Sequence, residues 1–169
     1  MSQRFLLDSN VLSELMRTAP APQVYNWFAN HSDDQIYVSS ISQAEIWAGI
    51  AALPQGKRRN ALADAAQMLL ETDMTDRCLV FGAAAAKHYA IIYANRRQMG
   101  RPISTQDAQI AAIALAEDLT LLTRNTQDFE GIEGLSVVNP WLPSREISDP
   151  SLRGAVIAKP EGLKQSRSQ

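Results

Sequence analysis

The stretch that decides the fold lies near the N-terminus and reads Phe5-Leu6-Leu7-Asp8-Ser9-Asn10-Val11-Leu12-Ser13-Glu14. Three consecutive apolar residues are typical of a strand whose two sheet faces are both covered by helices. Asp8 follows this run directly, so a charged side chain emerges where a buried strand ends. Alone, Asp8 reads most simply as the N-cap of the next helix. It is also the first candidate for a functional residue, because open α/β sheets bind ligands outside the carboxyl ends of their strands.

The rest of the chain alternates similar apolar runs with longer helical patterns. Three more runs predict strands at residues 36–39, 119–123 and 135–138, and residues 79–81 are either a further strand or a loop that leads into the next helix. Apolar residues at helical spacing predict helices over residues 24–28, 42–50, 57–72, 83–98 and 105–117. Strands that alternate with helices of this length imply crossover connections and a parallel sheet with helices on both faces. The predicted fold class is therefore α/β.

Composition and charge narrow the class of protein further. The chain has 169 residues, a formal net charge of -2 and 46% hydrophobic residues, which fits one globular domain and excludes binding of nucleic acid by bulk positive charge alone. A single cysteine, Cys78, excludes an internal disulfide framework and a cysteine zinc site. No stretch reads as a signal peptide or a membrane span, so we expect a cytoplasmic protein without membrane association. Residues 1–142 carry the predicted domain, and residues 143–169 read as a flexible C-terminal tail.

Acidic and amide side chains recur where the predicted strands end or the helices begin. Glu45 follows the second strand run, Asp107 opens a later helix, and Asn125 and Asp128 follow the fourth strand run. Each also has a simpler interpretation as a helix cap or an Asx-turn residue, and two capping-box patterns occur, Ser42-x-x-Glu45 and Ser104-x-x-Asp107. Taken one at a time, the simpler interpretation is favoured for every one of these residues.

Taken together, the acids indicate a cation site. Two carboxylates about 4 Å apart repel by about 4 kcal/mol at an effective dielectric constant of about 20, so three or four in one cleft are protonated or need a cation. His31 and His88 do not lie at these strand ends, so the ligands would all be oxygens, which suits Mg²⁺ or Mn²⁺. Carboxylate-held Mg²⁺ takes its remaining ligands from water and phosphate. The pattern therefore indicates phosphodiester or phosphoryl chemistry.

Four segments, in order, resemble the motifs of PIN domains. The first is the opening stretch quoted above, with Asp8 as its acid. The other three are Val38-Ser39-Ser40-Ile41-Ser42-Gln43-Ala44-Glu45-Ile46 with Gly49, Ile103-Ser104-Thr105-Gln106-Asp107-Ala108-Gln109-Ile110-Ala111-Ala112 and Leu122-Thr123-Arg124-Asn125-Thr126-Gln127-Asp128-Phe129. Val138-Asn139-Pro140-Trp141 resembles the last strand and its exit. The resemblance runs from about residue 4 to residue 142 and is strongest to the VapC and FitB type, the toxin half of type II toxin–antitoxin pairs.

This resemblance implies a three-layer α/β/α fold with a five-stranded parallel sheet of order 3-2-1-4-5, and an Mg²⁺-dependent endoribonuclease with Mn²⁺ as a substitute. It implies that Asp8 and Asp107 bind the metal directly, and that Glu45 binds it directly or through water. Glu45 or Asp128 would take a proton from the attacking water, leaving a 5′-phosphate and a 3′-hydroxyl. Some relatives have Asp where this chain has Asn125, and others have Asn there with an acid three residues on. The fourth catalytic position, Asn125 or Asp128, and the number of metals therefore stay open.

The resemblance also implies partners. RNA would be the substrate, a cognate antitoxin protein would neutralise the toxin, DNA would be bound only through the antitoxin, and the toxin would form a homodimer. We expect the basic residues Arg96, Arg97, Arg101 and Arg124 to contact RNA. The cluster Lys57–Arg59 is equally well explained as a solvated helix face.

Two other functions compete with a nuclease. One is a PIN-like module with a decayed site, acting mainly through a complex with an antitoxin and DNA. The presence of Asp8, Glu45 and Asp107 argues against decay, whereas Asn125 leaves room for it. The other is a different Mg²⁺-dependent phosphotransfer enzyme, which would need a glycine-rich phosphate loop after the first strand. That loop is absent from the sequence.

Overall fold

A computed structural model describes residues 2–143, and it contains one sheet of five parallel strands in the order β3-β2-β1-β4-β5. The strands are short: β1 (Phe5–Leu7), β2 (Ile36–Ser39), β3 (Cys78–Leu79), β4 (Thr120–Leu122) and β5 (Val137–Val138). The predicted sheet and its strand order are confirmed. The predicted tail, from residue 143 onward, lies outside the described residues apart from Pro143, so it remains a prediction.

Six helices connect and cover these strands: α1 (Ser9–Leu15), α2 (Pro22–Ala29), α3 (Ser40–Ala51), α4 (Lys57–Gln67), α5 (Ala83–Gln98) and α6 (Thr105–Ala116). Within residues 2–143 four shorter helical segments join them. Three are 3₁₀ helices, η1 (Asp33–Gln35), η3 (Thr75–Arg77) and η4 (Thr126–Phe129), and one is a π-helix, η2 (Met68–Asp73). Within residues 2–143 no helix combines the length and the apolarity needed to cross a bilayer.

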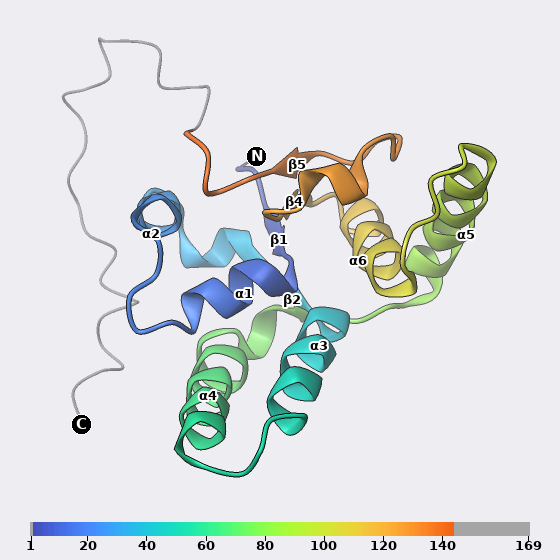
Figure 1. The fold of residues 1–169 in the computed structure, drawn as a ribbon. Coiled ribbons are helices and arrows are strands. Elements are labelled where there is room, and N and C mark those ends of the chain that lie inside the picture. The colour runs from blue at the N-terminus through green and yellow to red at the C-terminus, as the bar shows by residue number, and fades with distance from the viewer. Residues whose placement is uncertain (1, 144–169) are drawn as a thin grey trace, which may run out of the picture.

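Alternate residues of the central strand β1 enter two different cores, which produces the three-layer arrangement. Phe5 and Leu7 pack in a core with α1, α2, α3 and α4, whereas Leu6 packs in a second core with α5 and α6. Figure 1 shows α5 and α6 on one side of the strands and α1 to α4 on the other. Both faces of the sheet are therefore buried, which explains why β1 has no polar alternation.

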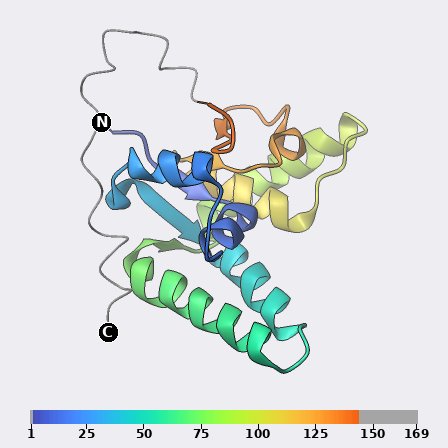
Figure 2. The same cartoon turned by 60° about the vertical axis from the view of Figure 1, so that its left-hand side comes forward.

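The two cores use different side chains. The core on the α1–α4 side contains large aromatic rings. The Phe5 and Trp27 rings pack edge to face, with their centroids 4.7 Å apart. The core on the other side is rich in alanine along α6, which lets helices and sheet approach closely. Figure 2 shows that α3 and α4 form a hairpin that extends away from the sheet. Lys57–Arg59 begin α4 at the far end of this hairpin.

The bounds of several elements differ from the predictions. Strands β4 and β5 are shorter than the predicted runs 119–123 and 135–138, and three further differences have a structural reason. The third strand is Cys78–Leu79 and not 79–81, because this edge strand pairs only with Val38 and Ser39, and Val80 is exposed. Helix α3 begins at Ser40, two residues before the predicted start, because Ser39 caps it as β2 ends. The single helix predicted over residues 57–72 is regular only to Gln67 and continues as the wider π-helical turns.

Candidate active site

Asp8 lies at the exact point where β1 passes into α1. Its backbone N–H donates to the carbonyl of Leu122 in the neighbouring strand β4, at 2.9 Å. One carboxylate oxygen accepts from the backbone N–H of Ser9 at 2.8 Å, so Asp8 is the N-cap of α1. The other oxygen accepts from the Thr123 hydroxyl at 2.8 Å and from the Asn10 amide at 3.3 Å. Only 4% of Asp8 is exposed, and burial raises the pKa of its carboxyl despite the Thr123 and Ser9 hydrogen bonds, which lower it.

Glu45 reaches the site from the first half of α3. The side chain of Ser39 caps α3 by accepting from the backbone N–H of Ser42 at 3.0 Å, so the predicted capping box of Ser42 and Glu45 is wrong. Glu45 is therefore not used to close the helix end, and its carboxylate accepts from the Ser9 hydroxyl at 3.4 Å. Partial burial raises the pKa of Glu45, and the charges of Asp8 and Asp107 raise it further.

Asp107 lies in the first turn of α6, on a helix of the opposite layer. Ser104 is the N-cap, and its hydroxyl accepts from the Asp107 backbone N–H at 3.1 Å. Partial burial raises the pKa of the Asp107 carboxyl, and the charge of Asp128 adds to this rise. The Ser104 hydroxyl and the Arg96 guanidinium act in the opposite direction on the same pKa.

The structure brings four carboxylates together at the carboxyl edge of the sheet: Asp8, Glu45, Asp107 and Asp128. The charges of Asp107 and Asp128 raise the pKa of Asp8, and those of Asp8 and Asp107 raise the pKa of Glu45. Asp107 and Asp128 are therefore near enough to Asp8 for their charges to act on it. Asp8 is buried, Asp107 is half-buried, and Glu45 and Asp128 are exposed. These acids come from four separate segments, namely the end of β1, α3, the start of α6 and η4.

Asn125 and Asp128, the two candidates for the fourth position, differ in how they join this cluster. The backbone N–H of Asn125 donates to the Thr123 hydroxyl at 3.1 Å, and its carbonyl accepts from the Asp128 N–H at 3.1 Å. Asn125 thus shapes the turn through its backbone, while Asp128 adds its charge to the cluster.

Sequence reasoning missed the polar residues that hold Asp8 in place. The Asn10 amide donates both to Asp8 and to the Thr123 hydroxyl, the latter at 3.1 Å. Thr123 is completely buried, and its hydroxyl donates to Asp8 across the junction of β1 and β4. The one signal in the sequence is that polar residues stand just after the first and fourth strands, with Asn10 two residues after Asp8 and Thr123 directly after Leu122.

The arginines expected to contact RNA do not form one patch. Arg96 is 5% exposed and donates to the carbonyls of Arg101 and Glu130 at 2.7 Å and 2.6 Å, so the expectation that it contacts RNA is corrected. Its proximity to Asp107 is real, but its donors support the protein backbone. Arg97 lies over the Tyr93 ring and donates to the Tyr93 hydroxyl, and Arg101 forms an exposed ion pair with Glu130 at 3.5 Å. Arg124 is exposed beside Trp141.

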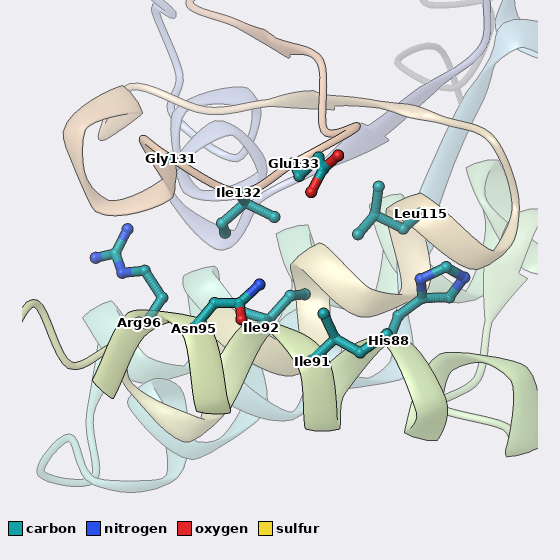
Figure 3. A pocket seen from close by; sticks show the side chains of 9 residues that line it. All are labelled: His88, Ile91, Ile92, Asn95, Arg96, Leu115, Gly131, Ile132 and Glu133. Carbon is teal, nitrogen blue, oxygen red and sulfur yellow. The ribbon is translucent and has the colours of Figure 1, made fainter. Parts of the chain in front are cut away.

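A pocket of about 200 Å³ lies between α5 and the loop before β5. Figure 3 shows Arg96 pointing from α5 toward the segment that carries Gly131 at one end of this pocket. Its lining residues are His88, Ile91, Ile92, Asn95, Arg96, Leu115, Gly131, Ile132 and Glu133. None of the candidate acids is among them, so the pocket is separate from the carboxylate cluster.

The carboxylate cluster offers oxygen ligands only, and it is not a closed cage. Within residues 2–143 no group of three or more His, Cys, Asp and Glu side chains is arranged so that it holds a metal ion as it stands. Mg²⁺ does not need such a cage, because it keeps several waters and is bound by one or two carboxylates together with substrate phosphates. An all-oxygen donor set whose members repel one another fits this type of cation.

Known proteins share both the sequence and the fold. The model of the PIN domain family matches residues 5–135. Plasmid stability protein StbB of Pseudomonas syringae pv. tomato is 42% identical over 136 residues, which cover 80% of this chain and 97% of StbB. VapC ribonuclease Y4jK of Sinorhizobium fredii is 35% identical over 82% of this chain and 99% of its own length. Toxin FitB of Neisseria gonorrhoeae is 35% identical over 80% of this chain and 97% of its own length.

A solved structure supports the same assignment. The structure of FitAB bound to an IR36 DNA fragment matches with a TM-score of 0.76 and 32% sequence identity. The match covers 84% of this chain and 99% of that chain, so it includes the whole sheet and the segments that carry the four acids. By sequence and by fold, this chain belongs to the PIN domain family, alongside toxins of the VapC and FitB type.

Proposed function

We propose that this chain is a divalent-metal-dependent endoribonuclease, the toxin of a type II toxin–antitoxin pair. The observation that carries the proposal is the buried carboxylate of Asp8 at the end of β1, held by Ser9 and Thr123. Glu45 is hydrogen-bonded to the same Ser9, and the charges of Asp107 and Asp128 act on Asp8. Carboxylates that repel one another destabilise the folded protein unless a cation is bound between them. Such clusters are therefore typical of functional sites. A relative named as a VapC ribonuclease supports RNA as the substrate.

Asp8 and Asp107 would hold the metal, Mg²⁺ or Mn²⁺, with Glu45 as a direct ligand or a ligand through water. The bound ion would polarise the scissile phosphate and lower the pKa of a water. Asp8 is prepared for this task because Ser9, Asn10 and Thr123 fix both of its oxygens. A ligand that is already oriented loses little freedom when it binds a cation.

Glu45 is the proposed base that takes a proton from the attacking water. Burial and the neighbouring acids raise the pKa of Glu45. A general base works best when its pKa is near the pH of the reaction, so this rise favours the role. The Ser9 hydroxyl fixes the direction of its carboxylate. Asp128 is the alternative base, and Asn125 would orient a water. In-line attack would leave a 5′-phosphate and a 3′-hydroxyl on the cleaved RNA.

The proposed partners follow from the same comparisons. An antitoxin protein would bind and neutralise this toxin in the cytoplasm, and DNA would be contacted only through that antitoxin. The solved structure of FitAB on a DNA fragment supports this arrangement. We also propose that the toxin forms a homodimer, and that Arg97 and Arg101 contribute positive charge to RNA binding.

A second candidate function is a catalytically weak PIN-like module that acts mainly through its antitoxin and DNA. The observation that favours it is Asn125, an amide where some relatives have an acid. Asp128 supplies an acid in the same turn and adds its charge to the cluster, so we favour the nuclease.

RNA cleavage by the purified, antitoxin-free chain tests the proposal. We expect cleavage with Mg²⁺ or Mn²⁺, none in EDTA, and at least a 10³-fold loss in Asp8→Asn and in Asp107→Asn. Asp64→Asn removes a carboxylate from the exposed side of α4 and serves as the matched control, with unchanged cleavage. Cleavage that persists in EDTA or in the Asp8→Asn/Asp107→Asn double variant would overturn the nuclease mechanism. Absence of cleavage, with intact antitoxin and DNA binding, would support the weak module.

A further inference from the structure

An exposed arginine stands at the same sheet edge as the four carboxylates. Arg124 is the second residue after β4 and follows Thr123, whose hydroxyl donates to Asp8. Its guanidinium carbon lies 5.2 Å from the centre of the Trp141 ring, which follows β5. An arginine over an indole face within about 6 Å is a cation–π pair. Two residues from neighbouring strand ends therefore form one unit beside the carboxylate cluster.

The backbone around Arg124 is fixed from both sides. Its N–H donates to the side-chain oxygen of Asn10 at 3.2 Å, and Asn10 also binds Asp8. Its carbonyl accepts from the Asn139 amide at 3.5 Å, while the Asn139 oxygen accepts from the Trp141 N–H at 2.9 Å. The exits of β1, β4 and β5 are thus linked through Arg124, and the start of its side chain has a defined direction.

The charge of Arg124 is not used inside the described part of the chain. Within residues 2–143 the ion pairs are Arg17 with Glu14 and Arg101 with Glu130. A cation next to a cluster of carboxylates would ordinarily turn toward them. Trp141, half-buried against the core on the α1–α4 side, instead holds the guanidinium over its ring. The five N–H donors of Arg124 remain available to an external anion.

We propose that Arg124, held by Trp141, is a phosphate-binding subsite for the RNA strand next to the bond that is cut. This rests on the proposed nuclease function. A planar guanidinium binds phosphate oxygens in a bidentate fashion, which suits a backbone phosphate. RNA also needs a positive group at this edge, because its phosphates approach four carboxylates. Trp141 acts through Arg124 and is a positioning residue.

The chain contains a matched control at the other end of the sheet. Arg4 precedes β1, and its guanidinium carbon lies 5.8 Å from the centre of the Tyr37 ring. Unlike Arg124, it donates to the carbonyl of Glu117 at 2.7 Å. Arg4→Gln and Arg124→Gln therefore each remove one positive charge that is stacked on an aromatic ring, at opposite edges of the same sheet.

The experiment compares these variants in single-turnover cleavage of a short single-stranded RNA and in RNA binding by fluorescence anisotropy, with Asp107→Asn as the background for binding. We expect Arg124→Gln to raise KM and Kd about tenfold while kcat changes little. The slope of log K against log salt should fall in magnitude by about 0.7, the value for one phosphate contact to a single strand. Arg124→Lys should recover part of the affinity, and Trp141→Leu should raise KM with the charge still present. Arg4→Gln should match the unaltered protein.

Three outcomes would overturn the subsite. KM, Kd and the salt slope of Arg124→Gln could equal those of Arg4→Gln. Arg124→Gln could weaken only the binding of the antitoxin, which would make Arg124 a protein contact. Both substitutions could lower thermal stability equally and leave RNA binding unchanged, which would make the Arg124–Trp141 pair purely structural. Failure of the unaltered chain to cleave RNA with any divalent metal would contradict the nuclease, and the anisotropy measurements would still decide the role of Arg124.

Discussion

The two edges of the same sheet are built in opposite ways. At the amino edge, polar side chains satisfy one another: Gln3 donates to the Thr120 hydroxyl at 2.9 Å, and Gln35 donates to the carbonyl of Gln3 at 2.7 Å. At the carboxyl edge, burial and mutual repulsion raise the pKa of three acids, Asp8, Glu45 and Asp107. The amino edge therefore contributes to stability, whereas the carboxyl edge lowers stability until a cation or substrate arrives.

The stability of the fold has a source other than the carboxyl edge. The two cores on either side of β1 stabilise the sheet as a whole, and they do not depend on which edge is considered. That reserve lets the chain keep charged groups in a partly buried position, a pattern common at functional sites. Substitutions at the two edges should therefore differ in their effects on activity and on stability.

The largest effect should come from Glu45→Gln at the carboxyl edge. If Glu45 accepts a proton from the attacking water, kcat should fall about 10²-fold or more, while the free energy of unfolding changes little. Single-turnover cleavage and urea denaturation of the same preparation measure the two quantities. Glu71→Gln, an exposed acid in η2, is the control. A fully active Glu45→Gln, together with an inactive Asp128→Asn, would assign the base to Asp128 instead.

Divalent metal should stabilise the chain through the carboxyl edge alone. At a concentration of about 100 times its Kd, a bound ion raises the free energy of unfolding by about 2.7 kcal/mol. For a chain of this size, that corresponds to about 5–10 °C in melting temperature. Thermal denaturation with Mg²⁺, against NaCl at equal ionic strength, measures the shift. An equal shift in Asp107→Asn would show that the ion binds elsewhere.

Without metal, Asp8→Asn should make the chain more stable at pH 7. The pKa of Asp8 is raised in the folded state, so the folded chain binds its proton more tightly than the unfolded chain does. Stability therefore falls as pH rises from the unfolded pKa through the raised folded pKa, and the loss is complete above both. Asparagine has no charge to lose, and its one amide oxygen can still accept from the backbone N–H of Ser9 while its NH2 donates to the Thr123 hydroxyl. Urea denaturation in EDTA between pH 4 and pH 8 tests this, and a less stable variant would contradict it.

The smallest effect should come from the amino edge. Gln3→Ala removes the hydrogen bond to Thr120, and we expect a loss of about 0.5 kcal/mol in the free energy of unfolding with unchanged RNA cleavage. Chemical denaturation and the cleavage assay measure both. A clear loss of cleavage in this variant would break the proposed separation between the two edges.

Much of this architecture was readable from the sequence because it depends on neighbours along the chain. Unbroken apolar runs such as Phe5–Leu7 predicted strands covered on both faces, and the alternation with helical patterns predicted parallel pairing. Asp8, Glu45 and Asp107 were nominated from their places after strands or at a helix start. Ser104 capping α6 through Asp107 was also predicted correctly, since a cap involves residues three apart.

The predictions that failed depended on distant parts of the chain. The capping pattern of Ser42 and Glu45 was plausible locally, but the end of β2 placed Ser39 at the cap and left Glu45 directed at Ser9. From the sequence alone, Arg96 is expected on the surface. In the structure it is buried and donates to the carbonyl of Glu130, which is 34 residues away along the chain. Such partners are invisible to any local pattern.

Strand and helix periodicity and caps are local properties, so the sequence predicts most of the elements, their order and the candidate acids. Which side chains meet depends on the tertiary structure. The contacts of Asp8 with Thr123, at a separation of 115 residues, and of Arg124 with Trp141 exist because parallel strands bring their carboxyl ends to one edge. The meeting of these side chains, the raised pKa values of the acids and the position of Arg124 beside them all depend on the assembled sheet.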